Sequence, residues 1–263
     1  MDLNLAKDWW GKHPLEQERL DLEVGDLHAT CRYQRDEFWI QYHYQSAIAA
    51  STQGIQTGKE EWSRHIARKL PQSIEITPCL PDRGVVVRPE QDFFLDVRAK
   101  AKVYVRVPIW LRFSYAASDP QSKVELPSVV LSLTWFGEFD HGELCYWISS
   151  SAKREYQRDE DRLFLAVCPI HITNEADEKL LISKLRLRVE TLALFVDNFQ
   201  LWGNETRVTY RGKDSVSKVE IVGGPPKEAK QATKISTPRR SITRAMNLRT
   251  FGRAWNWSGS YDI

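Results

Sequence analysis

The sequence lacks a long apolar run, and it lacks the short motifs that mark the common enzyme classes. No segment approaches the roughly 18 apolar residues that a membrane-spanning helix needs, so no transmembrane segment is predicted. GxSxG, GxGxxG and Walker-type loops are absent, which removes the usual signatures of serine hydrolases and nucleotide-binding enzymes. Neither HxH nor HxxxH spacing occurs, so no metal site and no cofactor is predicted.

Cysteine is also scarce, and its spacing excludes two further classes. Cys31, Cys79, Cys145 and Cys168 are scattered without a CxxC pair. They are expected to be isolated reduced thiols rather than zinc ligands or a disulfide framework. The start of the chain, MDLNLAKDWWGKHPLEQE, has neither the apolar core nor the small-residue cleavage site of a secretion signal. A cytoplasmic location is therefore expected.

Apolar residues are plentiful, while charge is unevenly distributed. Hydrophobic residues make up 42% of the 263 residues and aromatic residues 11%, which is enough for a folded core. The formal net charge is +2, yet residues 223–263 contain eight Lys or Arg against only Glu228 and Asp262. That segment opens with GGPP and contains few large apolar residues, which is typical of a flexible linker. We expect a domain at 1–222 and a basic, partly disordered tail at 223–263.

Alternation with a period of two dominates the first 222 residues. In KVYVRVPIWLRFSY, residues 102–115, the apolar side chains from Val103 to Tyr115 share one parity, which predicts a long half-buried strand. Pro108 within it cannot donate a ladder hydrogen bond, so a bulge, bend or edge position is expected there. The same alternation recurs in several other segments, while 85–88 and 162–172 are apolar on both parities. About ten or more strands are therefore expected, separated by turn residues. The sequence thus predicts an all-β fold, an antiparallel β-sandwich or barrel-like fold with little helix. Residues 59–70 fit a helix or a strand equally well.

Two stretches concentrate polar residues. The first, LTWFGEFDHGELCYW at 133–147, holds Asp140, His141 and Glu143. Gly137 and Gly142 bracket residues 136–142, which favours a hairpin loop between two strands with solvated polar residues. The alternative is a metal or acid–base site. Cys145 is expected to be a packed thiol rather than a nucleophile, which would need both a nearby base and partial exposure.

The second stretch is LPDRGVVVRP at 80–89, where Arg83 and Arg88 flank a strand that is apolar on both parities. An arginine there offers a planar fork for a carboxylate, which could be a structural partner such as Glu143 or an anionic ligand. Trp110, Trp135 and Trp147 are expected to be core or edge aromatics, with a ligand-stacking role for Trp135 as the alternative.

The tail could attach the protein to something else. Its basic segment, residues 227–257, could bind nucleic acid or an anionic membrane surface through clustered Lys and Arg. Docking on its own domain and docking on a protein partner are both open. The residues expected to make these contacts are Arg239, Arg240, Arg244, Trp255 and Trp257.

Four blocks together resemble a known family. LPDRGVVVRP at 80–89, VYVRVPIWL at 103–111, LSLTWFGEFDHGELCYW at 131–147 and CPIHITN at 168–174 are similar to domain-of-unknown-function family 432 of bacteria and archaea. The TWFG…GELCY block is the most specific. The resemblance implies a relative but no activity, cofactor or catalytic residue.

Two functional hypotheses follow. The first is a non-catalytic binding module that takes a protein partner or a small anionic ligand and uses its tail for attachment. The second is a hydrolase-like enzyme in which Arg83, Arg88, Asp140, His141 and Glu143 converge in one cleft. The position of these five side chains discriminates between the two hypotheses.

Overall fold

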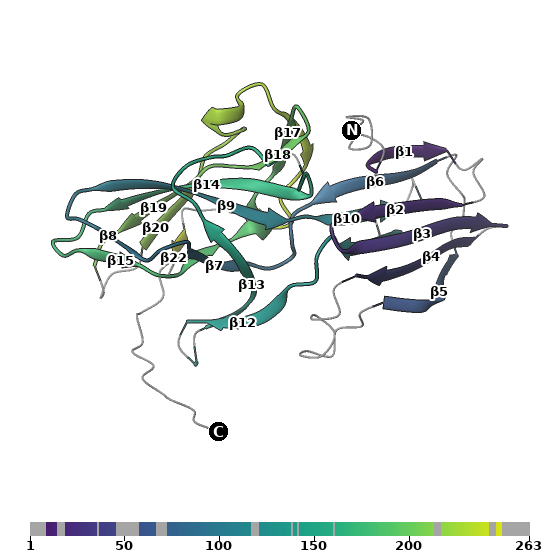
Figure 1. The fold of residues 1–263 in the computed structure, drawn as a ribbon, viewed down its shortest axis with the longest axis horizontal. Coiled ribbons are helices and arrows are strands. Elements are labelled where there is room, and N and C mark those ends of the chain that lie inside the picture. The colour runs from purple at the N-terminus through teal and green to yellow at the C-terminus, as the bar shows by residue number, and fades with distance from the viewer. Residues whose placement is uncertain are drawn as a thin grey trace.

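The computed structural model describes residues 9–14, 19–35, 37–45, 58–66, 73–116, 121–137, 139–140, 142–159, 161–212, 217–241 and 246–248. Within these ranges the chain forms strands and short 3-10 turns, and no α-helix. The all-β prediction is confirmed. Two lobes lie side by side along the long axis of the molecule (Figure 1).

The first lobe contains β1 (Gly11–Pro14), β2 (Leu20–Val24), β3 (Leu27–Gln34), β4 (Glu37–Tyr44), β5 (Gly58–Ile66), β6 (Ser73–Cys79), β10 (Trp110–Ser114) and β11 (Lys123–Pro127). These strands form two antiparallel sheets, ordered β2-β3-β4-β5 and β1-β6-β10-β11. The ambiguous segment 59–70 is thus a strand over the part that the structure describes. Phe38 stacks on Tyr115 with ring centroids 5.0 Å apart, so the two sheets share a core.

The second lobe contains β7 (Val85–Pro89), β8 (Phe93–Leu95), β9 (Lys100–Pro108), β12 (Ser132–Phe136), β13 (Glu143–Ala152), β14 (Leu165–Asn174), β15 (Leu180–Ile182), β16 (Leu185–Leu187), β17 (Leu194–Asp197), β18 (Gln200–Gly203), β19 (Thr206–Tyr210), β20 (Ser217–Ile221), β21 (Thr233–Ser236) and β22 (Met246–Leu248). One sheet has the order β12-β13-β7-β16, and a larger one has the order β21-β17-β18-β14-β19-β20-β22, with β9 also paired to β14. A small ribbon pairs β8 with β15. Most pairs are antiparallel, while β13 with β7 and β14 with both β18 and β19 are parallel.

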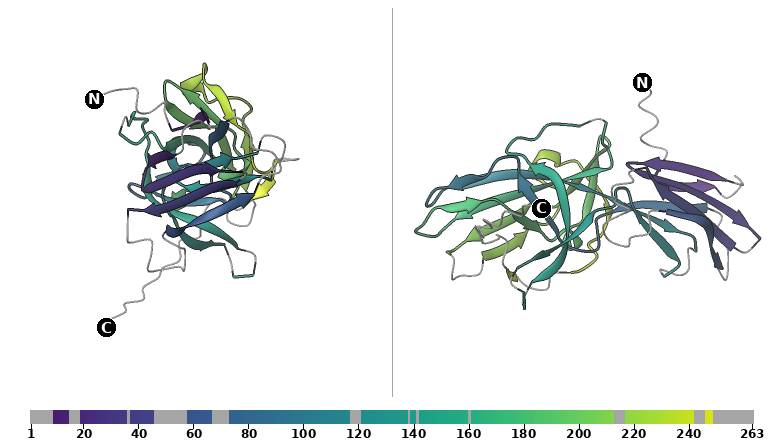
Figure 2. Two further views of the ribbon diagram at one scale, coloured as in Figure 1. Left: turned by 90° about the vertical axis from the view of Figure 1, so that its right-hand side faces the viewer. Right: turned by 60° about the horizontal axis from the view of Figure 1, so that its bottom comes forward.

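The long alternating segment 102–115 is divided at Pro108, where a bulge, bend or edge position was expected. β9 ends at Pro108 and pairs with β14 in the second lobe, whereas β10 begins at Trp110 and pairs with β6 and β11 in the first. Val103, Val105 and Val107 are fully buried. One apolar cluster continues through both lobes, so the two lobes share a core. Figure 2 shows the strands of the two lobes from two further directions.

Part of the predicted tail packs on the second lobe. Asn204 donates from Nδ2 to the carbonyl oxygens of Val222 and Gly224 at 3.1 and 2.8 Å. The chain then forms a 3-10 turn, η3 (Lys227–Ala229), and β21, which pairs antiparallel with β17. β22 pairs with β20. The predicted domain boundary near residue 223 stays a prediction, and residues 249–263 lie outside the described residues.

Candidate functional site

Three segments between β6 and β12 carry the chain from one lobe to the other. They are residues 79–84, 108–110 and 127–131. A hydrogen bond joins the second and third segments, because Ser128 N donates to Ile109 O at 2.9 Å. The second segment is also bound to the chain before β14, because Ile109 N donates to Phe164 O at 3.0 Å. The first segment contains the Pro-Asp-Arg-Gly sequence of the 80–89 stretch and is tied to β13, since Tyr146 N donates to Gly84 O at 2.9 Å.

A pocket of about 300 Å³ opens at this junction. It is lined by Tyr42, Tyr44, Arg83, Trp110, Glu125, Leu126, Pro127, Val129, Val130, Leu131, Leu133 and Tyr146. Strands of both lobes supply the walls, so the pocket exists only because the crossing segments bring the lobes together. Its volume is at the lower end of the range of small-molecule sites, roughly 300–1,000 Å³.

The walls are mainly apolar and aromatic. The rings of Trp110 and Tyr146 have centroids 6.1 Å apart, and those of Tyr42 and Tyr44 are 6.0 Å apart. Aromatic rings offer large apolar faces with defined geometry, which suits them to hold a ring or chain of a ligand. The valines and leucines of the 127–131 segment and β12 complete the lining.

Glu125 is held between two arginines at one end of the pocket. Arg112 Nε donates to its Oε1 at 2.7 Å, and Arg239 Nη1 donates to its Oε2 at 2.5 Å. Burial alone would raise the pKa of Glu125, but the hydrogen bonds and charges of Arg239 and Arg112 outweigh it and hold the pKa below its ordinary value. Glu125 is therefore an ionised structural carboxylate, with both oxygens occupied.

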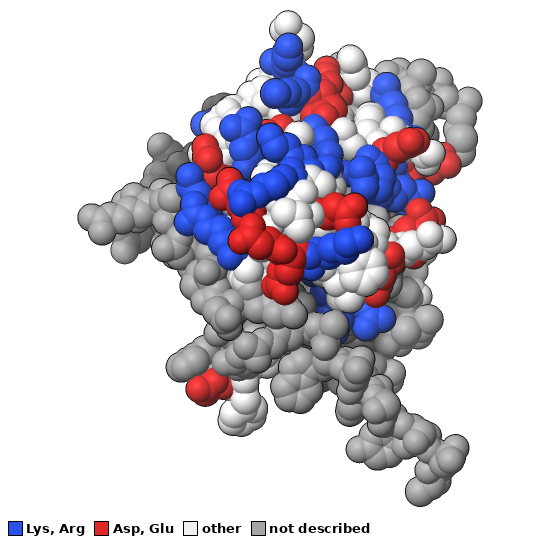
Figure 3. All heavy atoms as spheres, turned by 90° about the vertical axis from the view of Figure 1, so that its left-hand side faces the viewer, with Lys and Arg blue, Asp and Glu red and all other residues white. Residues whose placement is uncertain are grey.

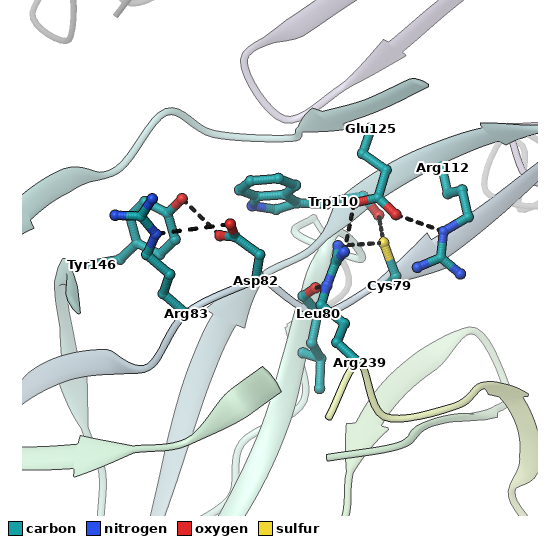
Figure 4. A network of polar contacts seen from close by, with 9 residues as sticks. All are labelled: Cys79, Leu80, Asp82, Arg83, Trp110, Arg112, Glu125, Tyr146 and Arg239. Atoms are coloured by element: carbon teal, nitrogen blue, oxygen red, sulfur yellow. Dashed lines mark hydrogen bonds and ion pairs between the residues drawn. The ribbon is translucent and has the colours of Figure 1, made fainter. Parts of the chain in front are cut away.

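Arg239 links the tail to the junction (Figure 4). Besides Glu125, its guanidinium donates to Leu80 O at 2.7 Å and to Cys79 Sγ at 3.1 Å, and it lies 5.4 Å from the centre of the Trp110 ring. Only 16% of the Arg239 side chain is exposed. Arg239 therefore docks on the protein's own domain, which is one of the alternatives that the sequence left open.

Asp82 and Arg83 lie on the other side of Trp110 (Figure 4). Tyr146 donates its hydroxyl to Asp82 Oδ1 at 2.9 Å. Burial, followed by the charge of Asp82 and this hydrogen bond, raises the pKa of Tyr146, which keeps it a neutral donor. Arg83 Nε is 3.8 Å from Asp82 Oδ2, too far for a hydrogen bond.

The structure does not bring the other predicted site residues into this pocket. Glu143 was expected as a partner for Arg83 or Arg88, but it pairs with Arg186 and Arg188, the latter through Nη2 at 2.6 Å. Alternate side chains of a strand point to opposite faces, so Glu143 and Tyr146 lie on different faces of the sheet. Arg88 lies over the ring of Trp147, 5.4 Å from its centre.

The remaining members of the 133–147 stretch follow the hairpin prediction. β12 and β13 pair antiparallel from Ser132 with Trp147 to Phe136 with Glu143, and Gly137 has a φ of 114° in the connection. Asp140 is exposed in that turn, and Trp135 is 52% exposed. His141 lies outside the described residues. Of the described members of the proposed catalytic cleft, Arg83 lines the pocket at the lobe junction, whereas Arg88, Asp140 and Glu143 do not.

All four cysteines, at positions 31, 79, 145 and 168, are free and buried. Cys145 packs with Val86, Phe136 and Trp147, and burial raises its pKa, as expected for a packed thiol. Across the described ranges, no three His, Cys, Asp or Glu side chains are grouped closely enough to hold a metal ion. No helix in that part of the chain is long and apolar enough to cross a membrane.

The remaining tail predictions are untested. Arg240 is exposed, and its backbone N donates to Glu190 O at 3.0 Å. Arg244, Trp255 and Trp257 lie outside the described residues, so attachment through them stays a prediction, as does the cytoplasmic location. At the far end of the second lobe, basic and acidic side chains are interspersed (Figure 3). The connection between β8 and β9 is paired with the one between β14 and β15, where Arg98 lies 3.2 Å from Asp177 and Asp96 lies 3.0 Å from Lys179.

Sequence reasoning found Arg83 and missed most of its neighbours. Asp82 lies in the 80–89 stretch, and Trp110 and Arg112 lie in the alternating segment 102–115, yet nothing local marked Glu125. Arg186 and Arg188 stand on the polar parity of LRLR at 185–188, which was a usable signal for charged side chains on one face. Their partner could not be found from that pattern.

The fold and site define a two-lobed all-β protein with a small, mainly apolar pocket at the lobe junction. The chain belongs to the family described as protein of unknown function (DUF432), whose model matches residues 9–254. The resemblance seen in the sequence blocks is thus confirmed, and it extends into the tail. Neither a curated protein nor a solved structure matches the chain.

Proposed function

We propose that this protein is a non-catalytic binding module that takes a small molecule in the pocket between its lobes. The observation that carries the proposal is the pocket of about 300 Å³, with aromatic and aliphatic walls drawn from both lobes. Ligand sites favour such concave, mainly apolar surfaces with a few fixed polar groups. Here those groups are Arg83 and the hydroxyl of Tyr146, which is oriented by Asp82.

The carboxylates at the junction support binding rather than acid–base catalysis. A general acid or base needs a pKa near the working pH and a free path to the proton that it transfers. Glu125 has both oxygens occupied by arginines, and its pKa is lowered. The hydrolase-like alternative would need Asp140, His141 and Glu143 to act together, and Glu143 is paired with Arg188 on the other face of the sheet.

A neutral fluorescent probe tests the proposal. N-phenyl-1-naphthylamine becomes bright in apolar sites, and we expect it to bind the wild-type protein saturably. Val129 lines the pocket, so Val129→Trp fills it and should weaken binding by at least tenfold. Val97 does not line the pocket and is 42% exposed, so Val97→Trp is the matched control and should bind as the wild type does.

Thermal unfolding of both variants shows whether each one is folded at the assay temperature. Binding that is unchanged in Val129→Trp, or a wild-type protein that does not bind the probe saturably, would contradict the proposal. A folded Val129→Trp protein with weakened binding, beside a normal Val97→Trp protein, supports it.

A further inference from the structure

We infer that the ligand of the interlobe pocket is an amphipathic anion, with an apolar ring or chain against Trp110 and Tyr146 and a carboxylate or similar oxyanion at Arg83. The inference rests on the function proposed above. It is carried by an independent observation, which is the difference between Arg83 and the other arginines around the pocket.

Three arginines and two carboxylates surround Trp110 at the junction. Arg112 and Arg239 each contact Glu125 within hydrogen-bond distance, at 2.7 and 2.5 Å. Each oxygen of Glu125 thus already accepts a hydrogen bond from an arginine. Counting formal charges, the cluster of Arg83, Arg112, Arg239, Asp82 and Glu125 retains one positive charge.

That positive charge is best assigned to Arg83. Its contact with Asp82 spans 3.8 Å, while Asp82 already accepts the hydroxyl of Tyr146 at 2.9 Å. Among the residues that the structure describes, Asp82 is the carboxylate that pairs with Arg83. The Arg83 side chain is 42% exposed. A guanidinium carries five N–H donors in a planar fork that matches a carboxylate or phosphate. Arg83 therefore keeps donors for an oxyanion at the pocket wall.

The rest of the lining determines the body of the ligand. Leu126, Val130 and Leu131 offer no charged group, and Trp110 and Tyr146 present ring surface. The pocket volume of about 300 Å³ limits that body to a small molecule. The body is thus an aromatic group or an alkyl chain. A fully charged or sugar-like molecule would leave its polar groups without partners along these walls.

A pair of probes that differ in charge tests the inference. 8-Anilinonaphthalene-1-sulfonate has the same aromatic body as N-phenyl-1-naphthylamine and adds one sulfonate. We expect the wild-type protein to bind the sulfonate more tightly, and Arg83→Gln to weaken that binding about tenfold or more while changing the neutral probe less than twofold. A charge-assisted hydrogen bond contributes roughly 1.5–3 kcal/mol, and 1.4 kcal/mol is a tenfold change.

Two further variants sharpen the result. Arg83→Lys keeps the charge without the planar fork and should lose less than Arg83→Gln. Arg98→Gln removes an equal charge from an exposed pair with Asp177 that does not line the pocket, and it should change neither probe. A loss in Arg98→Gln equal to that in Arg83→Gln would overturn the inference, since the effect would then be one of net charge.

A measurement without fluorescence uses decanoate and 1-decanol. Because a ligand that binds only the folded state raises its stability, decanoate should raise the unfolding temperature of the wild type more than 1-decanol does. Arg83→Gln should remove that difference. If Val129→Trp abolishes binding of both probes while Arg83→Gln changes neither, the pocket is a binding site but the inference of an anionic ligand is wrong.

If Val129→Trp leaves the binding of both probes unchanged, the proposed function itself is wrong.

Discussion

Arg239 Nη1 donates to Glu125 Oε2 at 2.5 Å, although 114 residues separate the two in the chain. Arg239 comes from the segment after β21, and Glu125 lies on β11 in the first lobe. The contact therefore joins the segment after β21 to the first lobe at the pocket wall. It couples the tail, the two lobes and the pocket wall in one polar network.

Removing Arg239 should destabilise the protein. Arg239→Gln leaves Glu125, a half-buried carboxylate, with one arginine in place of two, and we expect a loss of about 2–4 kcal/mol in the free energy of unfolding. Arg240→Gln is the matched control, because the exposed Arg240 side chain is adjacent while its backbone bond to Glu190 is kept. Urea denaturation measures both, and equal stability of the two variants would contradict the structural role of Arg239.

Glu125 should make the stability of the protein depend on acid pH. The pKa of Glu125 lies below its ordinary value of 4.5 in the folded state, so its contribution is complete above pH 4.5 and is lost as the pH falls through the lower, folded pKa. Glu125→Gln should be less stable than the wild type at pH 7, and the difference should shrink toward pH 3. Urea midpoints across this range measure it. A difference that does not change with pH would show that Glu125 stabilises by packing alone.

Gly25 should tolerate no larger residue. Its φ is +63°, and a Cβ atom there would lie 2.6 Å from Ser128 O on the crossing segment. Gly25→Ala combines a left-handed conformation with this clash, so we expect a loss of at least about 2 kcal/mol. Gly224→Ala has a φ of +79° but nothing within 4 Å, so it isolates the conformational part. Gly223→Ala has neither constraint and should be close to neutral. Thermal unfolding measures the stability of the three variants, with Gly25→Ala expected to be the least stable and Gly223→Ala the most stable. The reverse order would contradict the close approach of Gly25 to Ser128 O.

Glu143 should matter for stability more than its exposure suggests. Arg186, whose side chain is 5% exposed, pairs with Glu143, and within the described residues its Nε has no hydrogen-bond partner. Glu143→Gln leaves a buried guanidinium without its carboxylate, so we expect a loss of about 1–3 kcal/mol. Glu90→Gln removes an equal charge from an exposed position just after β7 and should cost less than about 0.5 kcal/mol. Denaturant unfolding compares them, and similar losses would mean that net charge rather than the buried pair is responsible.

Much of the fold could be predicted from short-range patterns. The alternating residues of 102–115, the break at Pro108 and the hairpin around Gly137 follow from side-chain parity and turn chemistry, which involve only neighbours in the chain. Residues 59–70 could not be assigned this way, because Trp62 and Ile66 satisfy both periods. The described part of this segment is a strand because β5 pairs with β4.

The sequence by itself determined that this chain is built from strands, that its cysteines are isolated, and that Arg83 stands at the start of a buried strand. Only the tertiary structure decided which groups meet. Tyr42, Arg83, Trp110, Glu125 and Tyr146 lie on five different segments, and Arg239 on a sixth, so no local pattern links them. The physical reason is that parity is fixed within a strand, whereas the pocket depends on the register of distant strands and on where the chain crosses between the lobes.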